Sequence, residues 1–136
     1  MSIKHRIENL RPCGNVICDV FHGREVVSVK ECFKSVGLQK TGFGVCSEIS
    51  KEEACDLIVN LLHKHIWTHE VVLDKELAIE ASEIFIGALH GEFRLYTNYM
   101  WGGIEPISHE WIDQGVVAAN GQGVVGILWV LDSEQP

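Results

Sequence analysis

The chain of 136 residues lacks any long run of apolar residues. No stretch reaches the roughly 18 consecutive apolar residues that a membrane-spanning helix needs. Its first residues, MSIKHRIENLRPCG, lack the apolar core of a signal peptide. The five cysteines are odd in number and contain no C-x-x-C pair, so neither a disulfide framework nor a zinc knuckle is indicated. We therefore expect a cytoplasmic protein without a membrane segment, whose cysteines stay reduced.

Basic residues are scarce in the second half of the chain. Residues 69–136 contain two Lys/Arg (Lys75 and Arg94) and eleven Asp/Glu, whereas residues 1–68 contain nine Lys/Arg and eight Asp/Glu. The halves thus carry net charges of −9 and +1, in a chain whose formal charge is −8. A negative field repels nucleic acid and membrane surfaces and attracts basic proteins. Solubility is the other explanation of this acidity.

The composition indicates one folded domain. Hydrophobic residues make up 46% of the chain and charged residues 22%, which is ordinary for a globular protein. No repeat, low-complexity tract or linker divides the sequence, and its length suffices for one core between two layers. We predict a single domain over residues 1–136, in which residues 1–13 form a loosely ordered N-terminal arm.

A capping box marks the start of the clearest helix, ISKEEACDLIVNLLHKHI. The hydroxyl of Ser50 can accept a hydrogen bond from the backbone N–H of Glu53, while the Glu53 carboxylate accepts one from the N–H of Ser50. The apolar residues that follow recur on one helical face.

A second helix is predicted over KELAIEASEIFIGALH, capped by Asp74 and ended by Gly91. Ile79 and Ile86 are predicted to lie on its far side, where a second copy of the chain could contact them in a homo-oligomer. The main apolar face is predicted to comprise Leu77, Ala81, Ile84, Phe85 and Ala88.

Alternating or continuously apolar segments predict about six strands. Residues 15–21 and 24–30 flank His22-Gly23, which suits a hairpin turn. The other predicted strands are 43–49, 92–97, 115–119 and 124–131, with a strand or connector at 70–74. Because residues 124–131 are almost all apolar, they are predicted to form a central strand covered on both faces. The expected fold is α+β, with a largely antiparallel sheet of about six strands and the two main helices packed on one face.

The segment HKHIWTHE (63–70) is histidine-rich and suggests a metal site. On a helix, His63 and His65 point about 200° apart and cannot share an ion. His65 and His69 have H-x-x-x-H spacing, but Ile66 stands where the zinc-protease motif needs a glutamate. We favour histidines that cap and pack at the end of the helix, and keep His65 and His69 as the alternative metal pair.

Two further segments carry weak catalytic signals. EPISHEWID (105–113) holds His109 and Asp113 four residues apart, with Glu105 and Glu110 nearby, which suits an acid–base pair or a metal site. Turn formation explains the same composition. GFGVCSEIS resembles a phosphate-binding loop but lacks the lysine of a Walker loop and the third glycine of a dinucleotide fingerprint. No complete catalytic constellation emerges, so we lean against an enzyme and expect no cofactor.

The connection between Thr97 and Gly115, NYMWGGIEPISHEWIDQ, is longer than compact domains usually contain without a function. Its aromatic anchors, ringed by acidic residues, are typical of a protein-binding hot spot. Packing of its tryptophans beneath their own loop is the alternative. The residues predicted to contact a basic protein partner are Tyr99, Trp101, Glu105, Glu110, Trp111 and Asp113.

The C-terminal segment DQGVVAANGQGVVGILWVLDSE resembles the C-termini of small acidic bacterial immunity proteins. Proteins of this kind neutralise a toxin domain, often a basic nuclease. The shared features are a Gly-Val-Val strand, a turn, a Gly-Ile-Leu-Trp-Val strand and an acidic end, and they transfer no residue roles. The resemblance implies a cytoplasmic inhibitor of a basic toxin. The alternative is a small-molecule-binding domain or a small enzyme, with a pocket lined by Trp67, His65, His69, Cys46 and His109.

Overall fold

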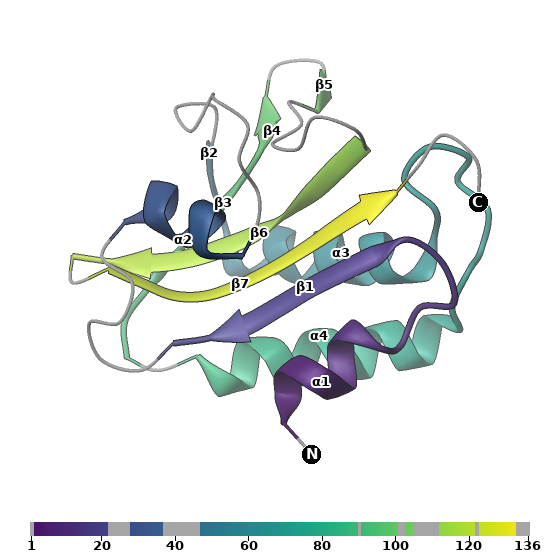
Figure 1. Ribbon diagram of the computed structural model, residues 1–136, viewed down its shortest axis with the longest axis horizontal. Coiled ribbons are helices and arrows are strands. Elements are labelled where there is room, and N and C mark those ends of the chain that lie inside the picture. Colours follow the sequence, from purple (N-terminus) through teal and green to yellow (C-terminus); the bar gives the residue numbers. More distant parts are fainter. Residues whose placement is uncertain are drawn as a thin grey trace.

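Five strands form one antiparallel sheet in the computed structural model (Figure 1). The structure describes residues 2–21, 28–36, 47–89, 91–100, 103–104, 112–121 and 123–132. In spatial order, the strands are β1 (Asn15–Val20), β7 (Gly123–Asp132), β6 (Ile112–Asn120), β3 (Arg94–Thr97) and β2 (Ser47–Ile49). Two short strands, β4 (Tyr99–Met100) and β5 (Gly103–Ile104), pair separately. The predicted α+β fold with a largely antiparallel sheet is confirmed.

Helices cover both faces of the sheet. The two main helices, α3 (Lys51–His63) and α4 (Lys75–Ala88), pack on one face together with the short helix α1 (Ile3–Glu8), and α2 (Val29–Ser35) packs on the other. The prediction that the two main helices share one face is confirmed. Among the described residues, no helix is long and apolar enough to cross a membrane.

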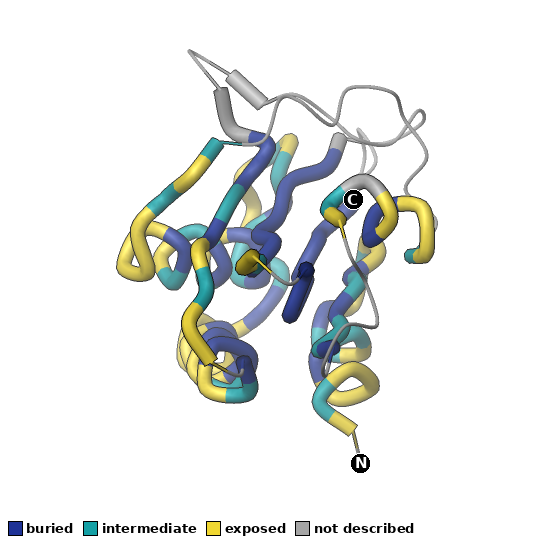
Figure 2. The backbone as a smooth tube through the Cα atoms, turned by 90° about the vertical axis from the view of Figure 1, so that its left-hand side faces the viewer, coloured by how far each residue is buried: buried dark blue, intermediate teal, exposed yellow. Residues whose placement is uncertain are grey.

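The strand β7, which lies inside the sheet between β1 and β6, separates two hydrophobic clusters, as its apolar sequence predicts. All ten of its residues are buried. Leu128 and Val130 belong to the cluster beneath α3 and α4, whereas Ile127 and Trp129 belong to the cluster beneath α2. Alternate side chains of a strand point to opposite faces, so both faces of β7 must be apolar. Figure 2 shows these buried strands beside helices whose outer surfaces are exposed.

The start of α3 is confirmed in detail. Glu53 N–H donates to Ser50 Oγ and Ser50 N–H donates to the Glu53 carboxylate, both at 3.0 Å. The hydrogen bond from the Ser50 backbone also lowers the pKa of Glu53. Asp74 caps α4 by accepting from the N–H of Glu76 at 2.9 Å. The prediction that Gly91 ends α4 is wrong, because the helix ends at Ala88 with Leu89 as its C-cap, although Gly91 has a positive φ of 72°.

Two expectations for the N-terminal region are wrong. Residues 28–30 do not continue a strand, because Ser28 caps α2 by accepting from the N–H of Glu31 at 3.1 Å. The strand β1 instead pairs with β7, and residues 22–27 lie outside the described residues. The expected loose arm contains α1, whose Ile7 is fully buried.

The buried face of α4 is rotated from the predicted one. Ile86, expected on the far side, is buried, whereas Leu77, expected in the core, is 44% exposed. The helix contacts α3 as well as the core beneath it, and Ser82 Oγ donates to the carbonyl of Cys55 on α3 at 3.5 Å. The buried arc therefore turns towards α3. Its members are Ala78, Ala81, Ser82, Phe85 and Ile86.

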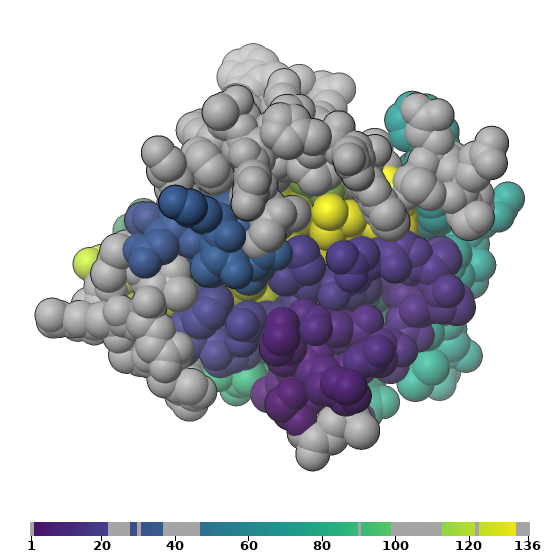
Figure 3. Space-filling view, in the orientation of Figure 1, coloured from purple at the N-terminus to yellow at the C-terminus, as the bar shows by residue number. Residues whose placement is uncertain are grey.

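The outer edge of β1 is covered by α1, and Figure 3 shows the atoms of these two elements in contact. The N–H of Cys18 donates to the Glu8 carboxylate at 2.9 Å, and Lys4 Nζ approaches the Cys18 carbonyl at 3.5 Å. Lys4 and Glu8 also pair with each other at 2.8 Å, and this hydrogen bond raises the pKa of Lys4. Two side chains thus satisfy backbone groups that would otherwise be open to another strand.

Candidate functional site

Within the segment predicted to bind a partner, residues 99–100 and 103–104 pair as a small hairpin apart from the main sheet. Tyr99 pairs with Ile104 and Met100 pairs with Gly103 in the β4–β5 ladder. The hairpin projects past the end of the five-stranded sheet at which β3 ends (Figure 1). Of the predicted contact residues, Tyr99 lies in this ladder. Trp101, Glu105, Glu110 and Trp111 lie outside the described residues.

The sixth predicted contact, Asp113, lies at the base of this connection and not on its surface. Its carboxylate is fully buried and accepts hydrogen bonds from Trp129 Nε1 at 2.9 Å and Asn98 Nδ2 at 3.4 Å. Asn98 Nδ2 also donates to the Asp113 backbone carbonyl at 2.8 Å. Asn98 precedes β4 and Asp113 is the second residue of β6, so these bonds tie together the two ends of the connection. We therefore leave Asp113 out of the contact surface.

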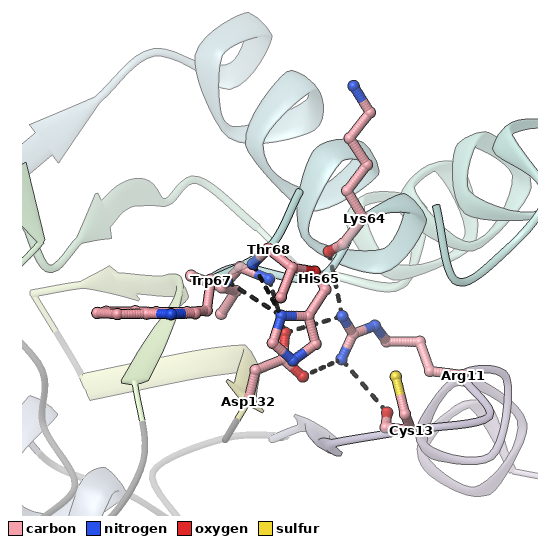
Figure 4. A network of polar contacts seen from close by, with 8 residues as sticks. Arg11, Cys13, Lys64, His65, Trp67, Thr68 and Asp132 are labelled. Carbon is pink, nitrogen blue, oxygen red and sulfur yellow. Dashed lines mark hydrogen bonds and ion pairs between the residues drawn. The ribbon is translucent and has the colours of Figure 1, made fainter. Parts of the chain in front are cut away.

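The histidine-rich segment begins at the last residue of α3 and forms the first part of the connection to α4 (Figure 4). His65 is 1% exposed, and its Nδ1 accepts hydrogen bonds from the backbone N–H of Trp67 at 3.2 Å and of Thr68 at 3.1 Å. His69 is exposed, with a φ of 62°. Because His65 Nδ1 accepts two backbone N–H groups, this nitrogen is not available to an ion shared with His69. His65 instead caps a turn, as the packing interpretation expects.

Next to His65, a buried ion pair joins the two ends of the chain. Arg11 Nη1 donates to Asp132 Oδ1 at 2.7 Å and Arg11 Nη2 donates to Oδ2 at 2.9 Å (Figure 4). The side chains are 1% and 0% exposed. Asp132 Oδ2 also accepts from the N–H of Ile66 at 2.8 Å, and Arg11 Nη2 donates to the Lys64 carbonyl at 3.1 Å. The pair therefore fixes the 64–66 backbone against the end of β7.

Gly14 shows how tightly this ion pair is packed. Its φ is 70°, and a Cβ at this position would clash with the Asp132 carboxylate. No other residue suits this position without strain. The network is not predictable from the sequence, because Arg11 and Asp132 are 121 residues apart and neither residue belongs to a local motif.

In comparisons with known proteins, no family model, curated protein or solved structure matches the chain.

The thiols described in the core are not suited to nucleophilic catalysis. Burial raises the pKa of Cys18 and of Cys32 to about 12. Both are therefore protonated at neutral pH, and the thiolate is the reactive form. The described residues also contain no group of three or more His, Cys, Asp or Glu side chains placed to hold a metal ion. Cys46 and His109, which complete the predicted small-molecule pocket, lie outside the described residues.

Two of the hollows on the described surface lie over the sheet and between the two main helices. One, of about 1000 Å³, lies over β2, β3 and the β6–β7 turn, where Arg94 pairs with Glu48 at 3.2 Å and both side chains are more than half exposed. The other, of about 320 Å³, lies between α3 and α4. The exposed large apolar residues among the described ones are Trp67, Val71, Leu77 and Ile79.

Proposed function

We propose that the chain is a small acidic protein-binding module, an immunity protein or inhibitor that neutralises a basic toxin domain such as a nuclease. The observation that carries the proposal is the β4–β5 hairpin, which lies apart from the five-stranded sheet. It belongs to the segment that the sequence marks as rich in aromatic and acidic residues. Aromatic anchors at the centre of an interface, surrounded by polar groups, contribute most of the binding energy.

The buried contacts at the base of the hairpin support this role. Asn98 and Trp129 are fully buried, and each donates a hydrogen bond to the fully buried Asp113. They hold the chain where it leaves β3 and where it enters β6. A binding segment with fixed ends loses less conformational entropy when a partner binds, which strengthens the complex.

The placement of the acidic residues supports a basic partner. Two of the described carboxylates in residues 69–136 are fully buried. Asp132 is paired with Arg11, and Asp113 is hydrogen-bonded to Trp129. The remaining described carboxylates of this half are at the surface, where they act on the approach of a partner. They are Glu70, Asp74, Glu76, Glu80, Glu83 and Glu92.

The proposal predicts a salt-sensitive complex with a basic protein. It also predicts that a basic secreted protein is encoded beside the chain; co-expression of the two and surface plasmon resonance measure their association. The association rate should fall at least about tenfold when NaCl rises from about 50 to about 300 mM, because salt screens the attraction between opposite charges. Absence of such a neighbour, failure to form a complex, or a rate indifferent to salt would each contradict the proposal.

A matched pair of charge variants locates the binding surface. Glu105→Gln/Glu110→Gln should slow association and speed dissociation, because it removes two carboxylates from the proposed contact. Glu70→Gln/Glu92→Gln removes the same charge from exposed positions elsewhere and should change only the association rate, by a small factor.

A further inference from the structure

A groove on the outer surface of the helical layer lies apart from the hairpin. It runs between α3 and α4 and has a volume of about 320 Å³. Ile79 lines its middle and is 39% exposed, although it lies on a helix whose other side is buried in the core. The groove is lined by Asp56, Val59, Asn60, His63, Lys64, Lys75 and Ile79.

The charges along this groove change sign from one end to the other. The helices follow each other through residues 64–74, so the end of α3 lies beside the start of α4. This brings Lys64 and Lys75 to one end of the groove, next to His63. Asp56 lies about two helical turns away along α3. On α4, the exposed Glu83 does not line the groove but lies one turn beyond Ile79, towards the same end as Asp56.

Such a surface is complementary to itself. In a two-fold symmetric dimer, each contact occurs twice. If residue i of the first copy contacts residue j of the second, then residue j of the first copy contacts residue i of the second. An axis near Ile79 would place the Lys64 and Lys75 end of one copy against the Asp56 and Glu83 end of the second. The two Ile79 side chains would meet at the centre. We propose that the α3–α4 groove is the interface of a homodimer.

The same charge pattern disfavours other occupants. A basic protein would be repelled at the Lys64 and Lys75 end, and a nucleic acid would be repelled by Asp56 and Glu83. A partner with the opposite polarity along its length satisfies both ends, and a second copy of the chain has this polarity. The groove shares no residue with the β4–β5 hairpin. Failure to form this dimer would therefore not contradict the proposed toxin complex, and the reverse also holds.

The dimer is expected to be weak because the groove is narrow and its charges are exposed. A small interface of this kind corresponds to a dissociation constant on the order of 10 µM. Sedimentation equilibrium of the purified full chain should therefore show monomer and dimer in exchange. Monomer alone at about 200 µM, well above this dissociation constant, would overturn the proposal.

Two exposed apolar residues of α4 provide a matched comparison. Ile79→Ser should weaken the dimer at least about tenfold, because it removes the apolar centre of the contact. Leu77→Ser replaces a residue that is 44% exposed on the same helix, but that borders α1 and not the groove. It should leave the dissociation constant within about twofold. Equal weakening by the two variants would contradict the proposed interface.

Charge exchange tests the pairing directly. Lys75→Glu alone and Asp56→Lys alone should each weaken the dimer at least about tenfold, because each places like charges together twice across the axis. The double variant Lys75→Glu/Asp56→Lys restores opposite charges and should return the dissociation constant to within about threefold of the original. Thermal melts of all three variants check that folding is unchanged. Failure of the double variant to recover dimerisation, with folding intact, would rule out this pairing.

Discussion

Replacement of Asp132 by alanine is expected to lower the free energy of unfolding by about 3–5 kcal/mol. The substitution leaves the Arg11 guanidinium charged and 1% exposed, without its carboxylate partner. It also removes the acceptor for the N–H of Ile66, which lies 2.8 Å from Asp132 Oδ2. Urea denaturation, monitored by circular dichroism, measures the decrease in the free energy of unfolding, provided that the slope of the transition is unchanged.

Two further variants test whether the loss of stability comes from the burial of the Arg11–Asp132 pair or from the loss of any ion pair. Arg6 and Glu80 pair at 2.8 Å, but their side chains are 53% and 54% exposed. Arg6→Ala should therefore cost less than about 1 kcal/mol. Arg11→Met/Asp132→Leu removes both buried charges and should recover much of the stability that Asp132→Ala loses. If Asp132→Ala were as mild as Arg6→Ala, the ion pair would not fix the ends of the chain as the structure indicates.

Phe33→Ala is expected to cost about 3–5 kcal/mol, because it removes the main side chain with which α2 covers the second face of the sheet. Phe33 is fully buried, and its ring meets that of Trp129 edge to face, with centroids 4.9 Å apart and planes at 73°. The loss should appear as a lower urea midpoint and a weaker near-ultraviolet circular dichroism signal from Trp129.

A surface position on the same helix provides the control for Phe33. Lys34 is exposed, and Lys34→Ala should change stability by less than about 0.5 kcal/mol. A Phe33→Ala variant as stable as Lys34→Ala would show that α2 contributes little to the core.

The sequence predicts those elements whose signals are local. Ser50 and Glu53 are three residues apart, so the capping box that starts α3 can be recognised without knowing the fold. The apolar run in β7 likewise indicates a strand covered on both faces. The same logic could have found α2, because Ser28 and Glu31 have capping-box spacing. The neighbouring Val-Val-Ser-Val run, with its β-branched residues, favoured a strand instead.

Contacts between distant segments could not be predicted in this way. Arg11 and Asp132 become partners only when β1 and β7 pair. Asp113 looks like one more loop carboxylate until the fold places Trp129 Nε1 beside it. The orientation of α4 depends on its packing against α3, which buries Ile86 and exposes Leu77. Tertiary packing thus decided which residues of the candidate site are buried and which remain at the surface.

The central claim is that the segment around the β4–β5 hairpin binds a basic protein, and a comparison of two tryptophans in that complex tests it most directly. In the sequence, Trp101 directly follows Met100, the last residue of β4, whereas Trp67 is 54% exposed in the α3–α4 connection. Trp101→Ala is predicted to weaken the complex by about 100-fold, as loss of an aromatic hot spot does. Trp67→Ala should change the dissociation constant by less than about threefold. Strong weakening by Trp67→Ala with little effect of Trp101→Ala would contradict the account.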